Sequence, residues 1–202
     1  MRHSFIYIAF AMLCLLSCKD GGEENFYPSV ITEFAMIRTD AEGAMSKMTT
    51  DDGRTYVISN PQSGYEKNVG YRVVCGYVPD GQTATLYHAT GACLLRDSTF
   101  LAYEPDPIKV TSIWLSGHYI NMQLAPLTQG GTQYWGYCID SLRSRTTHIT
   151  LHHRQNGDPP SYTQTVYASL SVDDLGTIPS GDSIALHIKT FTGGKVWTFR
   201  KP

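Results

Sequence analysis

Residues 118–124, His-Tyr-Ile-Asn-Met-Gln-Leu, carry the pattern that decides the fold of this chain. Ile120, Met122 and Leu124 alternate with polar residues, and the side chains of a β-strand point alternately to its two faces. One face of this strand is therefore expected to lie in a hydrophobic core. The same alternation recurs in three further segments, at 147–154, 166–172 and 184–188.

Turn sequences separate these segments. Gly130-Gly131 precedes an aromatic segment at 134–139, Asn156–Pro160 contains two prolines, and Gly193-Gly194 precedes a final apolar segment. About seven short alternating strands with turns at regular spacing are typical of an antiparallel β-sandwich. We therefore predict a β-sandwich for the C-terminal half.

The N-terminal half is also predicted to be β-structure. Residues 71–78 form a nearly continuous apolar run, which is expected of a central strand, and the turn at 79–82 leads into a second strand at 83–90. Further strands are expected at 29–38 and 54–59. Residues 40–50 show no clear pattern, and residues 93–95 fit either a short helix or a short strand. No long helical period occurs, so the fold class is all-β.

The segment Glu104–Pro107 is the best candidate for a domain boundary. Its two prolines cannot donate hydrogen bonds to a sheet and favour an extended link. The sequence therefore predicts a first β domain at 29–104 and a second at 108–202.

The N-terminus carries a targeting signal. A basic start at Arg2 is followed by an apolar run at 5–16, which is too short to span a membrane. The run ends in Leu15-Leu16-Ser17-Cys18, which resembles the lipobox of bacterial lipoproteins. This resemblance implies a signal peptide at 1–17, lipidation of Cys18, and attachment to a membrane through N-terminal acyl chains. An ordinary secretory signal with a chance cysteine is the alternative.

Residues 18–28 are predicted to be a flexible tether. The charged sequence Lys19–Glu24 has nothing apolar to bury. It resembles the export signals of lipoproteins in Bacteroidetes, although a plain solvated linker fits equally well. The expected location is the outer membrane, with the protein facing the periplasm or exported to the cell surface.

Charge and cysteine content exclude several classes of protein. Lys and Arg number 16 against 18 Asp and Glu, so the basic excess of a nucleic-acid-binding protein is missing. Beyond Cys18, the cysteines Cys75, Cys93 and Cys138 show no Cys-x-x-Cys spacing for zinc or redox exchange. They are expected to be small buried hydrophobic residues, with a Cys75–Cys93 disulfide left open.

Several segments resemble the NigD-like lipoprotein family of Bacteroidetes. Residues 112–121 contain a Trp-x-x-Gly-x-Tyr-x-Asn pattern, residues 149–158 resemble the family's Arg-, His- and Asn-rich strand and loop, and Gly70–Val73 is a fainter N-terminal match. Residues 183–186 and 194–197 fit its last hairpin. The resemblance implies an N-terminal OB-like β-barrel, a C-terminal immunoglobulin-like antiparallel β-sandwich and a lipid anchor. It brings no catalytic residues, and the order His-His-Arg at 152–154 departs from the Arg-His-Asn order of the family.

Three histidines in one predicted strand raise the question of a metal site. His148 and His152 share a face but are separated by about 13 Å at 3.3 Å per residue, and His153 points to the other face. Zinc needs nitrogen ligands at about 2.0–2.1 Å. We therefore predict no metal and no cofactor, and expect these histidines to face solvent or to cap loops.

The chain shows no motif of a known catalytic class, such as Gly-x-Ser-x-Gly, His-Glu-x-x-His or a P-loop. A pair of loop carboxylates for glycoside hydrolysis remains open, because only separation in space defines such a pair. The candidates are Asp51-Asp52, Asp158 and Asp173-Asp174. No catalytic residue is assigned.

Aromatic residues give the remaining candidate site. Tyr119, Tyr134, Trp135 and Tyr137 are a candidate binding surface for a sugar or peptide, although a sandwich core also needs large residues. Trp114 is expected in the core.

Two functions fit these observations. The first is a lipid-anchored cell-envelope protein that acts as a non-enzymatic binding or structural module with a protein or glycan partner. The alternative is a hydrolase or accessory factor acting on envelope or dietary carbohydrate. A cleft holding two close carboxylates would favour the alternative, and a flat, edge-rich or aromatic surface would favour the first.

Overall fold

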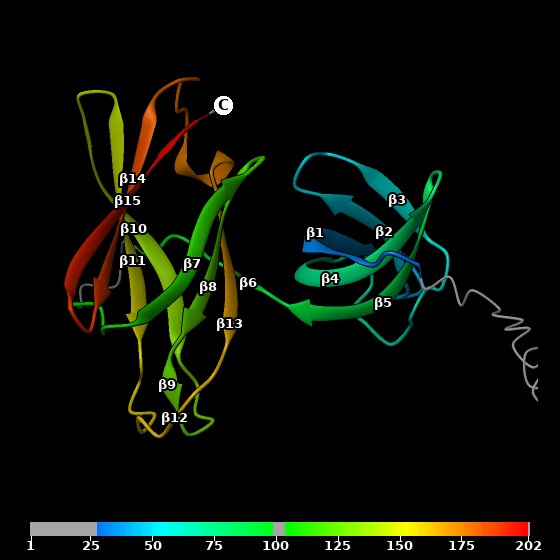
Figure 1. Ribbon diagram of the computed structural model, residues 1–202, viewed down its shortest axis with the longest axis horizontal. Coiled ribbons are helices and arrows are strands. Elements are labelled where there is room, and N and C mark those ends of the chain that lie inside the picture. The colour runs from blue at the N-terminus through cyan, green and yellow to red at the C-terminus, as the bar shows by residue number, and fades with distance from the viewer. Residues whose placement is uncertain (1–27, 99–103, 202) are drawn as a thin grey trace, which may run out of the picture.

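The computed structural model describes residues 28–98 and 104–201. Two β units lie side by side, as Figure 1 shows, and the described residues contain no α-helix. The predicted signal peptide at 1–17, the lipidation site Cys18 and nearly all of the tether at 18–28 lie outside the described residues. The all-β prediction is confirmed.

The first unit is a closed five-stranded barrel with strand order β1-β2-β3-β5-β4. Strands β1 and β4 pair and close it, and β3 and β5 are parallel while the other neighbours are antiparallel. This is the arrangement of an OB-like barrel. Its strands are β1 (Ile31–Thr39), β2 (Met45–Thr50), β3 (Thr55–Ile58), β4 (Gly70–Asp80) and β5 (Thr83–Gly91).

The barrel core explains why β4 is apolar along most of its length. Val73, Cys75 and Tyr77 point into the barrel, where they are at most 4% exposed. They pack against Ile37 of β1 and Met48 of β2. The strand β2 was missed by the sequence analysis, because Met45 and Met48 are its only large apolar residues and polar residues surround them. Its position depends on pairing with β1 and β3 rather than on its own pattern.

The second unit is a sandwich of two four-stranded sheets with a small two-stranded extension. One sheet has the order β6-β13-β8-β7, the other has the order β10-β11-β14-β15, and β9 pairs with β12. The elements are β6 (Cys93–Leu94), β7 (Lys109–Ser116), β8 (Tyr119–Ala125), β9 (Leu127–Thr128), β10 (Tyr134–Arg143), β11 (Thr146–Arg154), β12 (Tyr162–Thr163), β13 (Val166–Ser171), the 3₁₀ helix η2 (Asp173–Leu175), β14 (Ser183–Thr190) and β15 (Gly193–Arg200).

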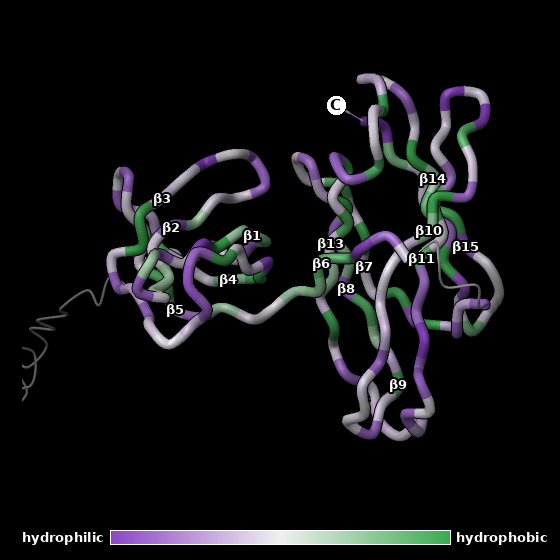
Figure 2. Tube along the Cα trace, turned by 180° about the vertical axis from the view of Figure 1, so that it is seen from behind, coloured by the Kyte–Doolittle hydropathy of each residue, from purple (hydrophilic) through white to green (hydrophobic). Residues whose placement is uncertain are grey.

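The sandwich core lies between the two sheets. Ile120, Met122 and Leu124 of β8 are fully buried there, as their alternation predicts. In Figure 2, hydrophobic positions lie along the strands of this unit, whereas the loop end around β9 is neutral to hydrophilic. Not every pair of strands is antiparallel, because β11 pairs with β14, and β6 with β13, in parallel. In this respect the sandwich differs from the predicted antiparallel one.

The passage from barrel to sandwich differs from the predicted boundary at Glu104–Pro107. Cys93 and Leu94 already pair with β13, and Leu95 is fully buried in the sandwich core. The change of unit therefore falls at Ala92. The Glu104–Pro107 segment lies within the sandwich, where the backbone amide of Asp106 donates to the carbonyl of His153 at 2.8 Å. Its prolines mark an irregular crossing, not a link between domains.

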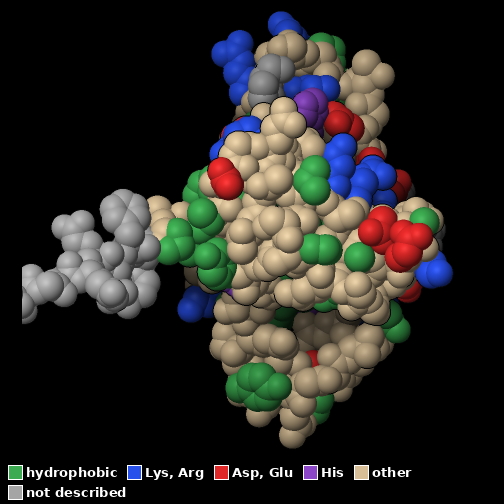
Figure 3. Space-filling model, turned by 90° about the vertical axis from the view of Figure 1, so that its right-hand side faces the viewer, with side chains coloured by type: hydrophobic (Ala, Val, Ile, Leu, Met, Phe, Trp, Pro, Cys, Tyr) green, Lys and Arg blue, Asp and Glu red, His purple; other side chains and the backbone are tan. Residues whose placement is uncertain are grey.

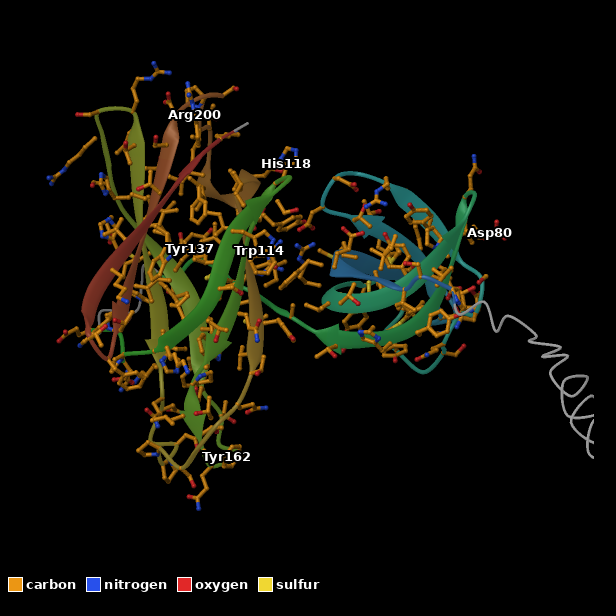
Figure 4. All side chains as sticks on the ribbon, viewed as in Figure 1. Asp80, Trp114, His118, Tyr137, Tyr162 and Arg200 are labelled. Atoms are coloured by element: carbon orange, nitrogen blue, oxygen red, sulfur yellow. The ribbon has the colours of Figure 1, made fainter. Side chains whose placement is uncertain are left out.

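The chain enters the barrel on the side away from the sandwich. Figure 1 shows that the first described residues lie there, and Figure 4 places Asp80, at the β4–β5 turn, at the same end of the molecule. The opposite end of the barrel faces β7, β8 and β13. Within the described ranges, no helix is long and apolar enough to cross a membrane.

Candidate functional site at the junction of barrel and sandwich

The Trp-x-x-Gly-x-Tyr-x-Asn pattern forms the face of the sandwich that meets the barrel. Trp114 and Asn121 are directly opposite one another across the β7–β8 pair, and Tyr119 shares their face. The other face of β8 fills the sandwich core, so this face would normally be solvated. The barrel covers it, and Asn121 is only 1% exposed.

Arg72 of β4 is the centre of the contact between the two units. Its side chain is 1% exposed and forms an ion pair with Asp51, Nη1 to Oδ1, at 2.6 Å. Its Nε donates to Ser169 Oγ at 3.0 Å, and its Nη2 donates to Asn121 Oδ1 at 2.9 Å. Asn121 Nδ2 in turn donates to Asp51 Oδ2 at 2.6 Å. We call these four side chains the junction network.

The junction network pairs the buried charges of Arg72 and Asp51, each of which would be costly to bury alone. Desolvating a guanidinium and a carboxylate costs several kcal/mol per ion, and only close pairing with further hydrogen bonds offsets that cost. Arg72 and Asp51 come from the barrel, whereas Asn121 and Ser169 come from the sandwich. Each unit thus completes the hydrogen bonding of the other, which holds the two units together in one relative position.

Aromatic rings surround the Arg72 guanidinium. Its central carbon lies 3.8 Å from the ring centroid of Tyr119 and 5.3 Å from that of Phe34. Phe34 makes edge contacts with Trp114 at 5.6 Å and with Tyr167 at 5.9 Å. A desolvated cation over aromatic faces is stabilised by the ring quadrupoles. The predicted core position of Trp114 is wrong: it is 39% exposed and lies on the barrel side of the sandwich, as Figure 4 shows.

Gly117 brings the β7–β8 turn against the barrel backbone. Its φ is +52°, which favours glycine, and a Cβ at this position would overlap the carbonyl oxygen of Asp51. The glycine of the family pattern is therefore required for a close approach between the two units.

A cleft of about 370 Å³ opens beside the junction network. Tyr65 and Tyr71 lie on its barrel side with ring centroids 5.9 Å apart. Arg96, on the sandwich side, is exposed and has no ion-pair partner among the described residues. The lining residues are Met45, Tyr65, Gly70, Tyr71, Arg72, Val73, Ala89, Gly91, Ala92, Leu94 and Arg96. This lining contains no carboxylate, histidine, cysteine, serine or threonine.

The chemistry of this junction cleft is that of a binding pocket. Apolar and aromatic side chains with a few polar groups are typical of ligand sites, which often lie between domains. Nucleophilic or acid–base catalysis needs a nucleophile with a neighbouring base, or a carboxylate pair, and the lining supplies neither. Arg96 is the one cation of this lining without an ion-pair partner, because Arg72 pairs with Asp51.

The four aromatic residues of the predicted binding surface do not form one surface. Tyr119 lies in the junction, Tyr134 is 51% exposed at one end of β10, and Tyr137 is buried in the sandwich core. Trp135 is half-buried and stacks on His153 with ring centroids 4.3 Å apart. Strand alternation places Tyr134 on the face of β10 opposite Trp135 and Tyr137. Of the four, only Tyr119 lies in the junction, where its ring contacts the Arg72 guanidinium.

The histidines of β11 do not all lie as predicted. His152 and His153 are buried, at 8% and 2% exposed, because the crossing segment at 95–98 and residues at 106 and 133 cover this end of the strand. His148 Nδ1 instead lies 3.0 Å from His187 Nε2. No group of three metal-ligating side chains occurs in the parts of the chain that the structure describes.

His153 belongs to a buried polar chain at the loop end of the sandwich. Its Nε2 bonds Gln133 Oε1 at 2.9 Å, and Gln133 Nε2 donates to Asp158 Oδ2 at 2.8 Å. Burial lowers the pKa of His153, so this imidazole is neutral at pH 7. The hydroxyl of Thr128, followed by the Gln129 amide, lowers the pKa of Asp158 to about 2. The strand-plus-loop segment of the family pattern therefore holds the β9–β10 and β11–β12 loops together.

Four of the five candidate carboxylates for hydrolysis make contacts elsewhere. Asp51 belongs to the junction network, and Asp52 pairs with Arg54 Nε at 2.6 Å. Asp158 accepts hydrogen bonds from the Gln129 amide and from Gln133 Nε2, and Asp173 Oδ1 lies 3.0 Å from His118 Nδ1. No two of these carboxylates line the junction cleft or the cleft that contains Asp158.

The three described cysteines are free, so the Cys75–Cys93 disulfide that the sequence left open is not formed. Burial raises the pKa of Cys75 to about 12 and raises that of Cys93. Raised pKa values disfavour the reactive thiolate of Cys75 and Cys93. Cys75 is buried, as expected from the sequence, whereas Cys93 and Cys138 are only partly buried.

The chain is similar to a family of proteins known from Bacteroides. The model of the NigD-like C-terminal beta sandwich domain matches residues 94–200. A NigD-like immunity protein from Bacteroides caccae is 25% identical with a TM-score of 0.65, covering 86% of this chain and 93% of that one.

Two less similar structures share the fold. A protein of unknown function from Bacteroides vulgatus is 14% identical with a TM-score of 0.67, covering 86% of this chain and 92% of that one. A candidate lipoprotein from Bacteroides fragilis is 12% identical with a TM-score of 0.59, covering 87% and 99%. No curated protein matches the chain. The match over its C-terminal half, at residues 94–200, shows that the chain belongs to the NigD-like family.

Proposed function

We propose that this chain is a lipid-anchored cell-envelope protein that acts by binding a partner protein and not by catalysis. The observation that carries this proposal is the junction cleft, which is apolar and aromatic, holds one free cation and lacks the side chains of a catalytic site. The relative from Bacteroides caccae is an immunity protein by name. Immunity by binding of a toxic protein is the form of partner binding that we propose for this chain.

The fixed contact between barrel and sandwich suits this role. A preorganised surface binds without first losing conformational freedom, so a junction that is already rigid favours affinity. The cleft lies between the units, and a partner seated there would contact both. No contact among the described residues favours the alternative of a carbohydrate hydrolase.

The position of the proposed anchor determines which of the two units lies nearer the membrane. Pro28 is ten positions after Cys18 in the sequence, so the segment between them reaches at most about 35 Å when extended. Because the described chain enters the barrel opposite the sandwich, the barrel would lie nearer the membrane and the sandwich farther from it. This holds whether the protein faces the periplasm or the cell surface. Figure 3 views the barrel end and shows acidic and basic side chains interspersed, with no extended basic patch on this face.

A protection experiment with three variants tests the proposal. A Bacteroides host that lacks the gene is made to express wild-type protein, Cys18→Ser or Arg96→Glu, and survival is measured against antibacterial proteins secreted by a panel of neighbouring strains. Wild-type protein should raise survival against at least one strain. Cys18→Ser should be lost from membranes and Arg96→Glu should remain there, and both should protect less.

The control is Arg38→Glu, which reverses an exposed charge on the barrel outside the cleft lining. It should protect like the wild type. Equal survival with and without the wild-type chain across the panel would contradict the immunity role. Full protection by Arg96→Glu would contradict the use of the junction cleft.

A further inference from the structure

A second apolar hollow, of about 320 Å³, lies at the edge of the sandwich far from the junction network. It runs between β7 and β15, which are the outermost strands of their two sheets. We call it the edge groove. The residues that matter for its chemistry are Ile108, Lys109, Val110, Phe191, Lys195 and Trp197.

The floor of the edge groove is hydrophobic and continuous with the core. Ile108 is 1% exposed, and Val110 and Trp197 pack against the sandwich core while remaining only partly buried. Phe191, in the turn between β14 and β15, is 57% exposed. An apolar group placed in the groove would remove this surface from water, which is favourable in proportion to the area covered.

Two lysines without counter-ions flank this apolar floor. Lys109 and Lys195 are exposed, and neither has an ion-pair partner among the described residues. The neighbouring Lys189 differs, because it pairs with Glu104 at 2.6 Å. No Asp or Glu lines the groove. The two ammonium groups therefore give the hollow a positive charge that no described carboxylate pairs with.

We propose that the edge groove binds a small organic anion that carries a carboxylate on an apolar acyl or aryl group. The apolar part would lie against Val110, Phe191 and Trp197, and the carboxylate would lie between Lys109 and Lys195. This site is independent of the partner-binding role, because it shares no residue with the junction cleft.

Matched small molecules test the required charge. The chain without the predicted signal peptide and lipidation cysteine, residues 19–202, is titrated with 3-phenylpropanoate, with the neutral 3-phenylpropan-1-ol and with the cationic 3-phenylpropylamine, by calorimetry and by the NMR signal of the Trp197 indole. The carboxylate should bind and shift the Trp197 signal, the alcohol should bind more weakly, and the amine should not bind.

Lysine variants test the required positions. Lys109→Met and Lys195→Met keep the apolar stem and should each weaken carboxylate binding by about fivefold, the upper range for a partly exposed ion pair. Lys67→Met, in the loop before β4, is the control and should change nothing. Equal binding of alcohol and carboxylate would overturn the proposal, as would unchanged binding by the double variant. If nothing binds and the double variant self-associates, the lysines only protect sheet edges and the proposal is wrong.

Discussion

Arg72 and Arg54 are two barrel arginines whose carboxylate partners are adjacent in sequence. Arg72 pairs with Asp51 in the junction network, where both side chains are at most 3% exposed. Arg54 pairs with Asp52 and Glu33 at the surface, and its side chain is 43% exposed. Both are arginine–carboxylate ion pairs, and the Arg72 pair differs in its burial and in its additional bonds to Asn121 and Ser169.

We expect Arg72→Met to lower the free energy of unfolding by about 3–5 kcal/mol, because it leaves Asp51 buried without a counter-ion. Arg54→Met should lower it by no more than about 1 kcal/mol, because water solvates the carboxylates that remain. Urea denaturation of both variants and the wild type at pH 7 measures the difference. Equal losses for the two variants would show that the junction network does not depend on the buried charge.

At the scale of elements, the loop end of the sandwich shows how one carboxylate joins two loops. Asp158 follows β11 and accepts hydrogen bonds from the amides of Gln129 and Gly131 at 2.9 and 3.0 Å. These donors precede β10, so the loops before β10 and after β11 are fixed to each other. Hydrogen bonding to the charged form lowers the carboxyl pKa and links the stability of this end of the sandwich to pH.

The pKa of Asp158 predicts the acid sensitivity of the loop end. Its pKa is about 2 in the folded chain against 3.8 ordinarily, so the unfolded state binds the proton first as the pH falls. The stability that this carboxylate contributes is therefore complete above about pH 4 and is lost as the pH falls toward 2. Wild type should be more stable than Asp158→Asn at pH 5, and the gap should narrow at pH 2.5. Urea denaturation at both pH values measures the gap, and a constant gap would contradict the assignment.

At the scale of the whole molecule, barrel and sandwich are held in one arrangement by contacts that neither makes alone. The junction network supplies the polar contacts, and Phe34 with Trp114 and Tyr167 supplies the apolar ones. The backbone approach at Gly117 requires that the turn between β7 and β8 has no side chain. We expect the two units to tumble together in solution.

Gly117→Ala should separate the motions of the two units. Its Cβ would overlap the carbonyl oxygen of Asp51, and its positive φ adds strain of about 1–2 kcal/mol. Gly157→Ala is the matched control, since Gly157 has a φ of +76° and nothing within 4 Å of a Cβ. In ¹⁵N relaxation, barrel and sandwich amides should share one correlation time in the wild type and in Gly157→Ala, and two in Gly117→Ala. A single correlation time in all three would contradict the role of this close approach.

The sequence by itself determined the all-β class and most of the strands. Alternation in Ile120, Met122 and Leu124 defines the inner face of β8, because the period of a strand is two whatever surrounds it. A turn signal such as Gly130, which is at positive φ, ends a strand through local backbone geometry alone. Residues 45–50 show no strand pattern of their own, and the pairing of β2 with β1 and β3 decides their conformation.

Only the tertiary structure decided what covers the second face of each strand. Alternation places Tyr119 and Asn121 on the face of β8 opposite its core residues. The same alternation occurs whether that face is covered by solvent or by a neighbouring domain. The junction network joins residues 51, 72, 121 and 169, and no spacing along the chain relates them. His152 and His153 are buried by segments that cross from elsewhere in the sandwich. Local periodicity fixes the two faces of a strand, and packing of distant segments fixes which of those faces meets water.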